Sequence, residues 1–303
     1  MTNSIKDIHI RDRRLNPAEA EVAISVTPEH VFSMTQVRGR LVGPQCRYAS
    51  TVEVAYALRE TGRDYASEGI PGIICKVLIP EPSLWDPVSP FLYKGQVELW
   101  ESGKQSEVVH ITHCLRELSL GRYGLRINGA ALSLRGKALL GPVSEADAIS
   151  LHNQGINTLL VDADNSTPIL WDMADQLGFV ILTRISNEQE LKMALGRTRE
   201  IRNRSFCLGW LISPQAVKNE LALIAAQILL STPLLGLELT RAPSGPVPEG
   251  FTFVAYEENL AASLAEIKMP SLLLTSREEP GDLSARKDWS SGVCLGWIGK
   301  GTD

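Results

Sequence analysis

The chain has 303 residues, a formal net charge of −5 and a hydrophobic content of 44%. This length accommodates two ordinary domains, and the balance of apolar and charged residues excludes a disordered chain or a coiled coil. No apolar run of about twenty residues and no basic block occurs, so we expect neither a membrane span nor a nucleic-acid-binding surface. The N-terminal segment is charged almost from its start, unlike a signal peptide, and we expect a cytoplasmic protein.

The cysteines are scattered and lie mostly among apolar residues. They are Cys46, Cys75, Cys114, Cys207 and Cys294. This distribution predicts reduced, buried thiols rather than a disulfide framework. No cluster of Cys, His or carboxylates has the spacing of metal ligands, so we expect no metal and no cofactor.

Residues 1–120 are predicted to form an immunoglobulin-like β-sandwich. Apolar and polar residues alternate in several short segments separated by turn signals, a period of two that is typical of half-buried strands. The segments are residues 21–26, 51–60, 72–80, 94–102 and 107–113. Several such strands in about a hundred residues favour a sandwich of two antiparallel sheets.

Residues 121–303 show a different pattern, in which short apolar runs alternate with amphipathic stretches. Strands are predicted at residues 131–136, 157–164, 179–185, 205–213, 234–241, 251–258, 271–279 and 292–300, and helices at 144–155, 168–178, 187–201, 214–230 and 259–267. Eight strands with intervening helices predict a (β/α)8 TIM-type barrel, shortened relative to the usual length of about 250 residues. A doubly wound open sheet is the competing fold, but its GxGxxG turn is absent.

Several segments resemble family 2 glycoside hydrolases. PEPSLWDPVSPFLYKGQVEL (residues 80–99) is similar to the Leu-Trp-x-Pro-x-x-Pro-x-Leu-Tyr segment that closes the immunoglobulin-like domain of that family. HCLREL, INGAALSLRG and WDMADQLGFVILTRI follow in the order and at the spacing of further family motifs. The resemblance covers about residues 20–300 and implies a sandwich followed by a TIM-type barrel.

The resemblance also implies that both catalytic carboxylates are replaced. Aligning Trp210 with a family Trp puts Pro214 and Gln215 where the family has Asn and its acid/base Glu. The nucleophile position, at the end of the seventh strand, holds Thr275 or Ser276. A retaining mechanism needs two carboxyl groups about 5 Å apart, and neither an amide nor a hydroxyl can take the part of one. We therefore expect a pseudoenzyme.

Other positions of the implied pocket are partly changed. The Glu that usually ends the third strand is Arg184, whereas Arg135 and Trp297 match family residues of the pocket floor and of the sugar-stacking wall. Arg135 fits an internal salt bridge equally well. Trp210 and Trp297 have a simpler interpretation as packing residues that fill the centre of a shortened barrel.

Acidic residues gather near the C-terminal ends of the predicted strands, where barrel sites are built. They are Asp162, Asp164, Glu238, Glu257, Glu258, Glu278 and Glu279. Their simpler interpretation is that they cap the N-termini of the helices that follow, where acidic side chains are favourable.

Three hypotheses for function follow. The first is a non-catalytic relative of the hydrolases that acts as a carbohydrate-binding or protein-interaction module. The second is an active glycosidase with displaced carboxylates, namely Glu238 or Glu257 together with Glu278. The third is a structural subunit or homo-oligomer, because missing helices would leave part of the barrel flank uncovered.

Overall fold

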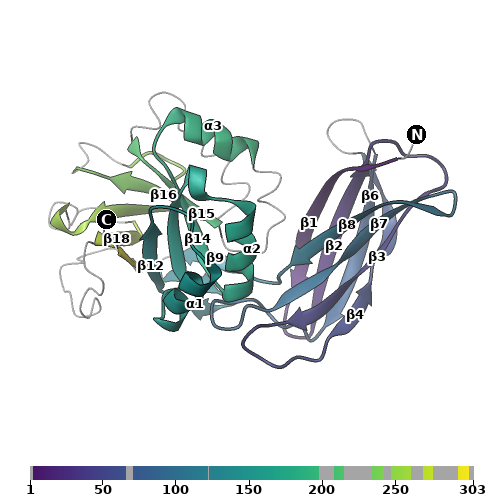
Figure 1. The fold of residues 1–303 in the computed structure, drawn as a ribbon, viewed down its shortest axis with the longest axis horizontal. Coiled ribbons are helices and arrows are strands. Elements are labelled where there is room, and N and C mark those ends of the chain that lie inside the picture. Colours follow the sequence, from purple (N-terminus) through teal and green to yellow (C-terminus); the bar gives the residue numbers. More distant parts are fainter. Residues whose placement is uncertain are drawn as a thin grey trace. The chain divides into compact units, whose positions relative to one another are not determined.

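The structure, a computed structural model, describes residues 3–65, 71–121, 123–197, 208–214, 234–241, 247–260, 269–275 and 293–299. It divides into two compact units, the first ending at Arg116 and the second beginning at Glu117 (Figure 1). The first unit is built of strands, and the second combines strands with helices.

Two four-stranded antiparallel sheets make up the first unit. One sheet has the order β1 (Ile5–Leu15), β2 (Glu19–Pro28), β6 (Pro71–Pro80), β5 (Arg59–Tyr65), and the other has the order β4 (Val54–Ala57), β3 (Thr35–Gln45), β7 (Leu92–Glu101), β8 (Lys104–His113). With the strands taken as A to G and β4 as an additional strand beside C, this is the immunoglobulin arrangement, in which A, B, E and D face C, F and G.

One face of each sheet contributes to a shared core. Val22 and Ile24 of β2 are fully buried and belong to the same apolar cluster as Val97 and Leu99 of β7. Side chains alternate between the two faces of a strand, so the residues between these point away from the core. The apolar residues of the alternating sequence pattern are therefore the ones that form the sandwich core.

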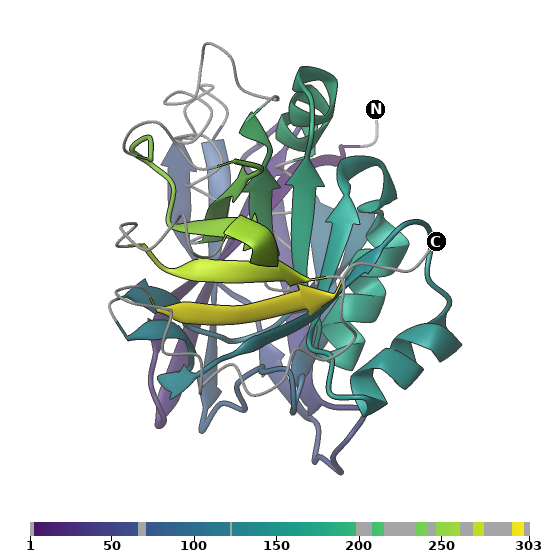
Figure 2. The ribbon, with the colours of Figure 1, turned by 90° about the vertical axis from the view of Figure 1, so that its left-hand side faces the viewer.

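A closed parallel barrel makes up most of the second unit. A small antiparallel sheet of β9 (Leu118–Gly121), β10 (Gly124–Ile127) and β11 (Ala130–Ala131) precedes it. The barrel strands are β12 (Leu134–Leu139), β13 (Thr158–Asp162), β14 (Val180–Ile185), β15 (Leu208–Ile212), β16 (Leu234–Leu239), β17 (Phe253–Glu257), β18 (Ser271–Thr275) and β19 (Cys294–Gly299). Strand β12 pairs with both β13 and β19, which closes the ring (Figure 2). The eight predicted strands are confirmed.

Helices α1 (Glu145–Asn153), α2 (Pro168–Leu177) and α3 (Glu188–Gly196) follow the first three barrel strands. Each begins at a residue whose side chain accepts a backbone N–H hydrogen bond from the first turn, namely Ser144, Thr167 and Asn187. Residues 215–230 and 261–267, predicted to be helical, lie outside the described residues. None of the described helices is long and apolar enough to cross a bilayer.

The centre of the barrel is filled by its own side chains. Leu182, Leu234 and Phe253 are fully buried and face inward, and a Cβ atom at Gly209 would lie 2.3 Å from Cδ2 of Leu182. The alternate strand residues pack outward in a second cluster with the helices. Because the interior is a packed core, a ligand site belongs at the C-terminal end of the strands.

Candidate functional site

Four charged residues near the C-terminal ends of barrel strands share the inward-facing side. They are Asp162 of β13, Arg184 of β14, Glu238 of β16 and Glu257 of β17, which we call the rim cluster. Their neighbours Val161, Leu239 and Tyr256 pack outward against the helices. Strand alternation therefore turns the rim cluster inward. All four side chains are partly exposed.

An ion pair joins two members of the rim cluster. Nε of Arg184 lies 3.3 Å from Oε2 of Glu238, and the two side chains are 25% and 16% exposed. Nε is buried and its N–H makes no hydrogen bond, so the contact is Coulombic rather than directional. The ion pair therefore engages the carboxylate of Glu238 with a cation from a strand that is not its neighbour in the barrel.

Asp162 lies beside this pair. It is the register partner of Arg184 across β13 and β14. Asp162 also precedes the 3₁₀ turn η1 (Ala163–Asn165), yet its side chain makes no capping hydrogen bond there. Asp164, in the first turn of η1, is exposed to solvent. The simpler interpretation of Asp162 as a helix cap therefore does not hold for η1.

A buried hydrogen-bond network fixes the loop that follows Asp162. The hydroxyl of Ser166 lies 3.1 Å from that of Thr183 in β14 and accepts a hydrogen bond of 3.0 Å from the indole N–H of Trp171 in α2. Arg197, which follows α3, donates to the carbonyl oxygen of Ser166 at 2.9 Å. The turn after β13 is thus tied to two helices and the next strand, which limits its movement.

Two exposed apolar side chains lie in the segments that follow barrel strands β12 and β13. Leu140 directly follows β12 and is 63% exposed, and Ile169 at the start of α2 is 80% exposed. Among the described residues, no group of three or more His, Cys, Asp or Glu could hold a metal ion.

The two tryptophans predicted from the sequence lie on β15 and β19, and their side chains face the outer cluster. Trp210 is 1% exposed and packs in the outer cluster, and its indole N–H has no hydrogen-bond partner in the described part of the chain. Trp297 is partly buried against the same cluster. The idea that these side chains fill the barrel centre is wrong, because β-strand alternation turns both outward and leaves the centre to leucine and phenylalanine.

Arg135 and Thr275 also lie apart from the rim cluster. The side chain of Arg135 is exposed, its guanidinium lies close to Gly155 before β13, and its register partner is Trp297. Thr275 is 1% exposed and shares the outward parity of Leu273.

The remaining predicted positions divide into two groups. Glu258, the residue after β17, is partly exposed. Gln215, Ser276, Glu278 and Glu279 lie outside the described residues. Sequence reasoning named Arg184 and Glu238 separately and missed their pairing, and it did not name Leu140 or Ile169. The signal available for the pairing was that both residues lie on the inward side of their strands.

Comparison with solved structures identifies the class of fold. A glycosyl hydrolase family 2 member from Bacteroides cellulosilyticus matches with a TM-score of 0.66 at 13% identity, over 99% of this chain and 44% of that one. A β-glucuronidase from Bacteroides uniformis matches with a TM-score of 0.67 at 12% identity, over 97% of this chain and 47% of that one. A β-glycosidase from Bacteroides vulgatus matches with a TM-score of 0.65 at 14% identity, over 90% of this chain and 38% of that one.

The chain therefore has a glycoside hydrolase family 2-like fold, as the sequence motifs predict. It spans less than half the length of each of these three proteins. No protein-family model and no curated protein sequence matches it.

Proposed function

We propose that the chain is a non-hydrolytic protein built on a shortened (β/α)8 barrel, which binds a carbohydrate at the rim cluster. The Arg184–Glu238 ion pair carries this proposal. A retaining glycosidase needs one carboxyl group that attacks and another that donates a proton. The carboxylate of Glu238 is engaged by a guanidinium, and Thr275, one of the two residues at the implied nucleophile position, is a buried hydroxyl.

Binding is supported by the remaining groups of the same rim. Asp162 and Glu257 are partly exposed carboxylates on the inward side of the barrel, and Leu140 and Ile169 are exposed apolar residues that follow β12 and β13. Carboxylates accept strong, charge-assisted hydrogen bonds from sugar hydroxyls. The alternative binding function is that this surface binds a protein partner or a second copy of the chain.

A hydrolase with displaced carboxylates is the second candidate. It is favoured by Glu238 and Glu257, which come from neighbouring strands and share the inward side. Assays with chromogenic aryl β-galactosides, β-glucuronides and β-mannosides from acidic to neutral pH distinguish the two functions. We expect no turnover. Turnover that disappears in Glu238→Ala or Glu257→Ala would establish the hydrolase instead.

Sugar binding is tested by thermal unfolding in the presence of the corresponding free sugars. A ligand that binds only the folded chain raises its stability by mass action. We expect one of the sugars to raise the midpoint, and Asp162→Asn to abolish the rise. No stabilisation by any of them, or an equal rise in Asp162→Asn, would contradict binding at the rim cluster.

A further inference from the structure

The outer face of the β3–β7 pair in the sandwich carries a compact set of polar and aromatic side chains. Gln36 lies opposite Trp100 in the register, Arg38 opposite Glu98 and Arg40 opposite Gln96. Lys94 follows on β7 with the same parity. Val37, Leu41, Val97 and Leu99, which alternate with these residues, are buried in the sandwich core. We call this set, Gln36, Arg38, Arg40, Lys94, Gln96, Glu98 and Trp100, the sheet face.

Trp100 and Arg38 form an ordered platform on the sheet face. The guanidinium carbon of Arg38 lies 4.5 Å from the centroid of the Trp100 ring, and Arg38 donates to Gln36 Oε1 at 3.0 Å. Glu98 accepts hydrogen bonds from the Trp100 indole at 2.8 Å and from Gln96 at 2.6 Å. These contacts fix the side chains before any ligand arrives, which lowers the entropic cost of binding.

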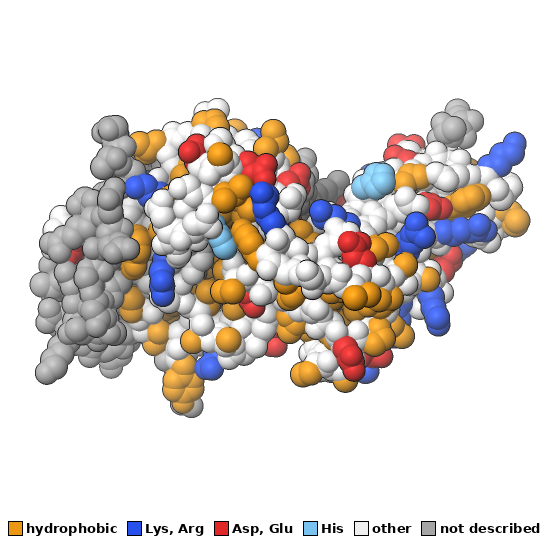
Figure 3. All heavy atoms as spheres, turned by 60° about the horizontal axis from the view of Figure 1, so that its bottom comes forward, with side chains coloured by type: hydrophobic (Ala, Val, Ile, Leu, Met, Phe, Trp, Pro, Cys, Tyr) orange, Lys and Arg blue, Asp and Glu red, His pale blue; other side chains and the backbone are white. Residues whose placement is uncertain are grey.

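The sheet face carries positive charge that is not neutralised. Within the described ranges, Arg38, Arg40 and Lys94 have no carboxylate within ion-pair distance, and the one carboxylate of the face, Glu98, is directed to neutral donors. Figure 3 shows one face of the molecule, on which Lys and Arg side chains of the sandwich lie interspersed with Asp and Glu. A chain with a net charge of −5 attracts anions weakly as a whole, so an anionic ligand would be held by this local arrangement.

The position of the face within the sheet limits the kind of ligand. Strand β3 lies between β4 and β7, and β7 lies between β3 and β8, so their backbone groups are already paired. An extended peptide cannot add to these strands by main-chain hydrogen bonds and would lose that source of affinity. A polysaccharide is bound through side chains alone, by planar groups against its rings and by donors to its hydroxyls and carboxylates.

We infer that the sheet face is a binding site for an anionic polysaccharide, independent of the rim cluster. Arg38, held flat by Trp100, stacks on a sugar ring and donates to its carboxylate, because a guanidinium combines a planar surface with a fork of donors. Arg40 lies about 7 Å further along the strand and, with Lys94, holds the next acidic group. Gln36 and Gln96 donate to hydroxyls between them.

The probe is polygalacturonate, with fully methyl-esterified pectin as its uncharged counterpart, and binding to the full chain is followed by calorimetry at low ionic strength. We expect polygalacturonate to bind and the ester not to bind. The double variant Arg40→Ala/Lys94→Ala should weaken binding roughly ten-fold, because two exposed charge pairs are lost. A control, Arg59→Ala/Lys104→Ala, removes the same charge from exposed positions elsewhere in the sandwich and should leave the affinity unchanged.

Arg38→Lys separates a stacking site from a simple cationic patch. It keeps the charge and loses the planar fork, and we expect it to weaken polygalacturonate binding as much as the double variant does. Equal effects of the two double variants, or equally tight and equally sensitive binding of polyglutamate, would overturn the inference. Asp162→Asn should leave polygalacturonate binding unchanged, which separates this result from any outcome at the rim cluster.

Discussion

Arg184 and Glu238 form an ion pair although their strands are not neighbours in the barrel. Strand β15 lies between β14 and β16, and the two side chains meet on the inward side of the barrel, across β15. Only an arginine long enough to reach across one strand, and turned inward by alternation, makes this contact. The rim of the barrel is therefore stabilised by a pair that no local sequence pattern contains.

We predict that Arg184→Ala destabilises the chain by about 1–3 kcal/mol, because Glu238 is left as a largely buried carboxylate without its cation. Urea denaturation measures the change. The double variant Arg184→Met/Glu238→Leu should recover much of the loss, since no uncompensated charge remains. Lys192→Ala is the matched control, because its partner Glu188 is on an exposed helix surface, and its effect should stay within about 0.5 kcal/mol. A loss as large as that of Arg184→Ala would refute this account.

We predict that Gly236→Ala overpacks the barrel interior. A Cβ atom at this position would lie 2.3 Å from Cζ of Phe253, and forcing an extra carbon into a packed core costs about 1–3 kcal/mol. The midpoint of thermal unfolding should fall, and Phe253→Leu in the same chain should restore part of it. Gly141→Ala, where no atom lies within 4 Å of the added carbon, is the control and should have little effect. No fall in the midpoint would mean that the ring of Phe253 can move aside.

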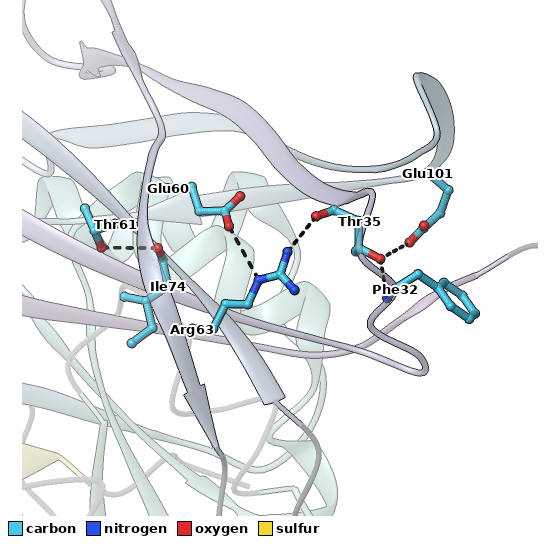
Figure 4. Close-up of polar contacts among 7 residues, drawn as sticks. All are labelled: Phe32, Thr35, Glu60, Thr61, Arg63, Ile74 and Glu101. Atoms are coloured by element: carbon cyan, nitrogen blue, oxygen red, sulfur yellow. Dashed lines mark hydrogen bonds and ion pairs between the residues drawn. The ribbon is translucent and has the colours of Figure 1, made fainter.

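We predict that Thr35→Val destabilises the sandwich by about 1–3 kcal/mol at nearly constant volume. The Thr35 hydroxyl accepts from the backbone N–H of Phe32 at 2.8 Å and donates to Glu101 at 2.7 Å (Figure 4). Thr35 is 1% exposed, so water cannot replace these bonds. Thr35→Ser keeps the hydroxyl and should lose less, as measured by denaturant unfolding. No loss in Thr35→Val together with a loss in Thr35→Ser would show that the methyl group matters and the hydrogen bonds do not.

We predict that stability falls as the pH rises from about 9 to about 12. Burial raises the pKa of Cys75 from 9.0 to about 12 and that of Tyr93 from 10.0 to about 12. Above the ordinary pKa values the unfolded chain loses these protons while the folded chain keeps them, so the unfolded state binds fewer protons and is favoured. The urea midpoint should decline across this window. Cys75→Ala and Tyr93→Phe should each flatten the decline, and an unchanged slope in both would contradict the prediction.

The alternation of residue types predicts the strands whose inward side is continuous and apolar. It misses β1, whose segment IKDIHIRDRRL is dominated by charged residues on the outward side of an edge strand. It also misses β3, whose glycines and proline are typical of a loop. Gly39 is required there for another reason: its φ is +148°, and a Cβ atom would lie 2.0 Å from the carbonyl oxygen of Gln96 on β7.

The acidic strand ends are visible in the sequence, but the side on which each residue lies depends on register. Asp162 and Glu238 turn inward, whereas Trp210 and Trp297, chosen by alignment, turn toward the helices. A shift of one residue reverses the side on which every residue of a strand lies, so alignment at low identity finds the strand more reliably than the face.

The pairing of β12 with β19 has a consequence for the order of events during synthesis. Leu134 is the register partner of Gly296, so the ring closes only after β19 has left the ribosome. Until then β12 and β18 expose unpaired backbone edges, which are templates for association with other chains. The newly made barrel therefore depends on protection from aggregation until its final strand arrives, whereas the sandwich, complete by His113, can fold much earlier.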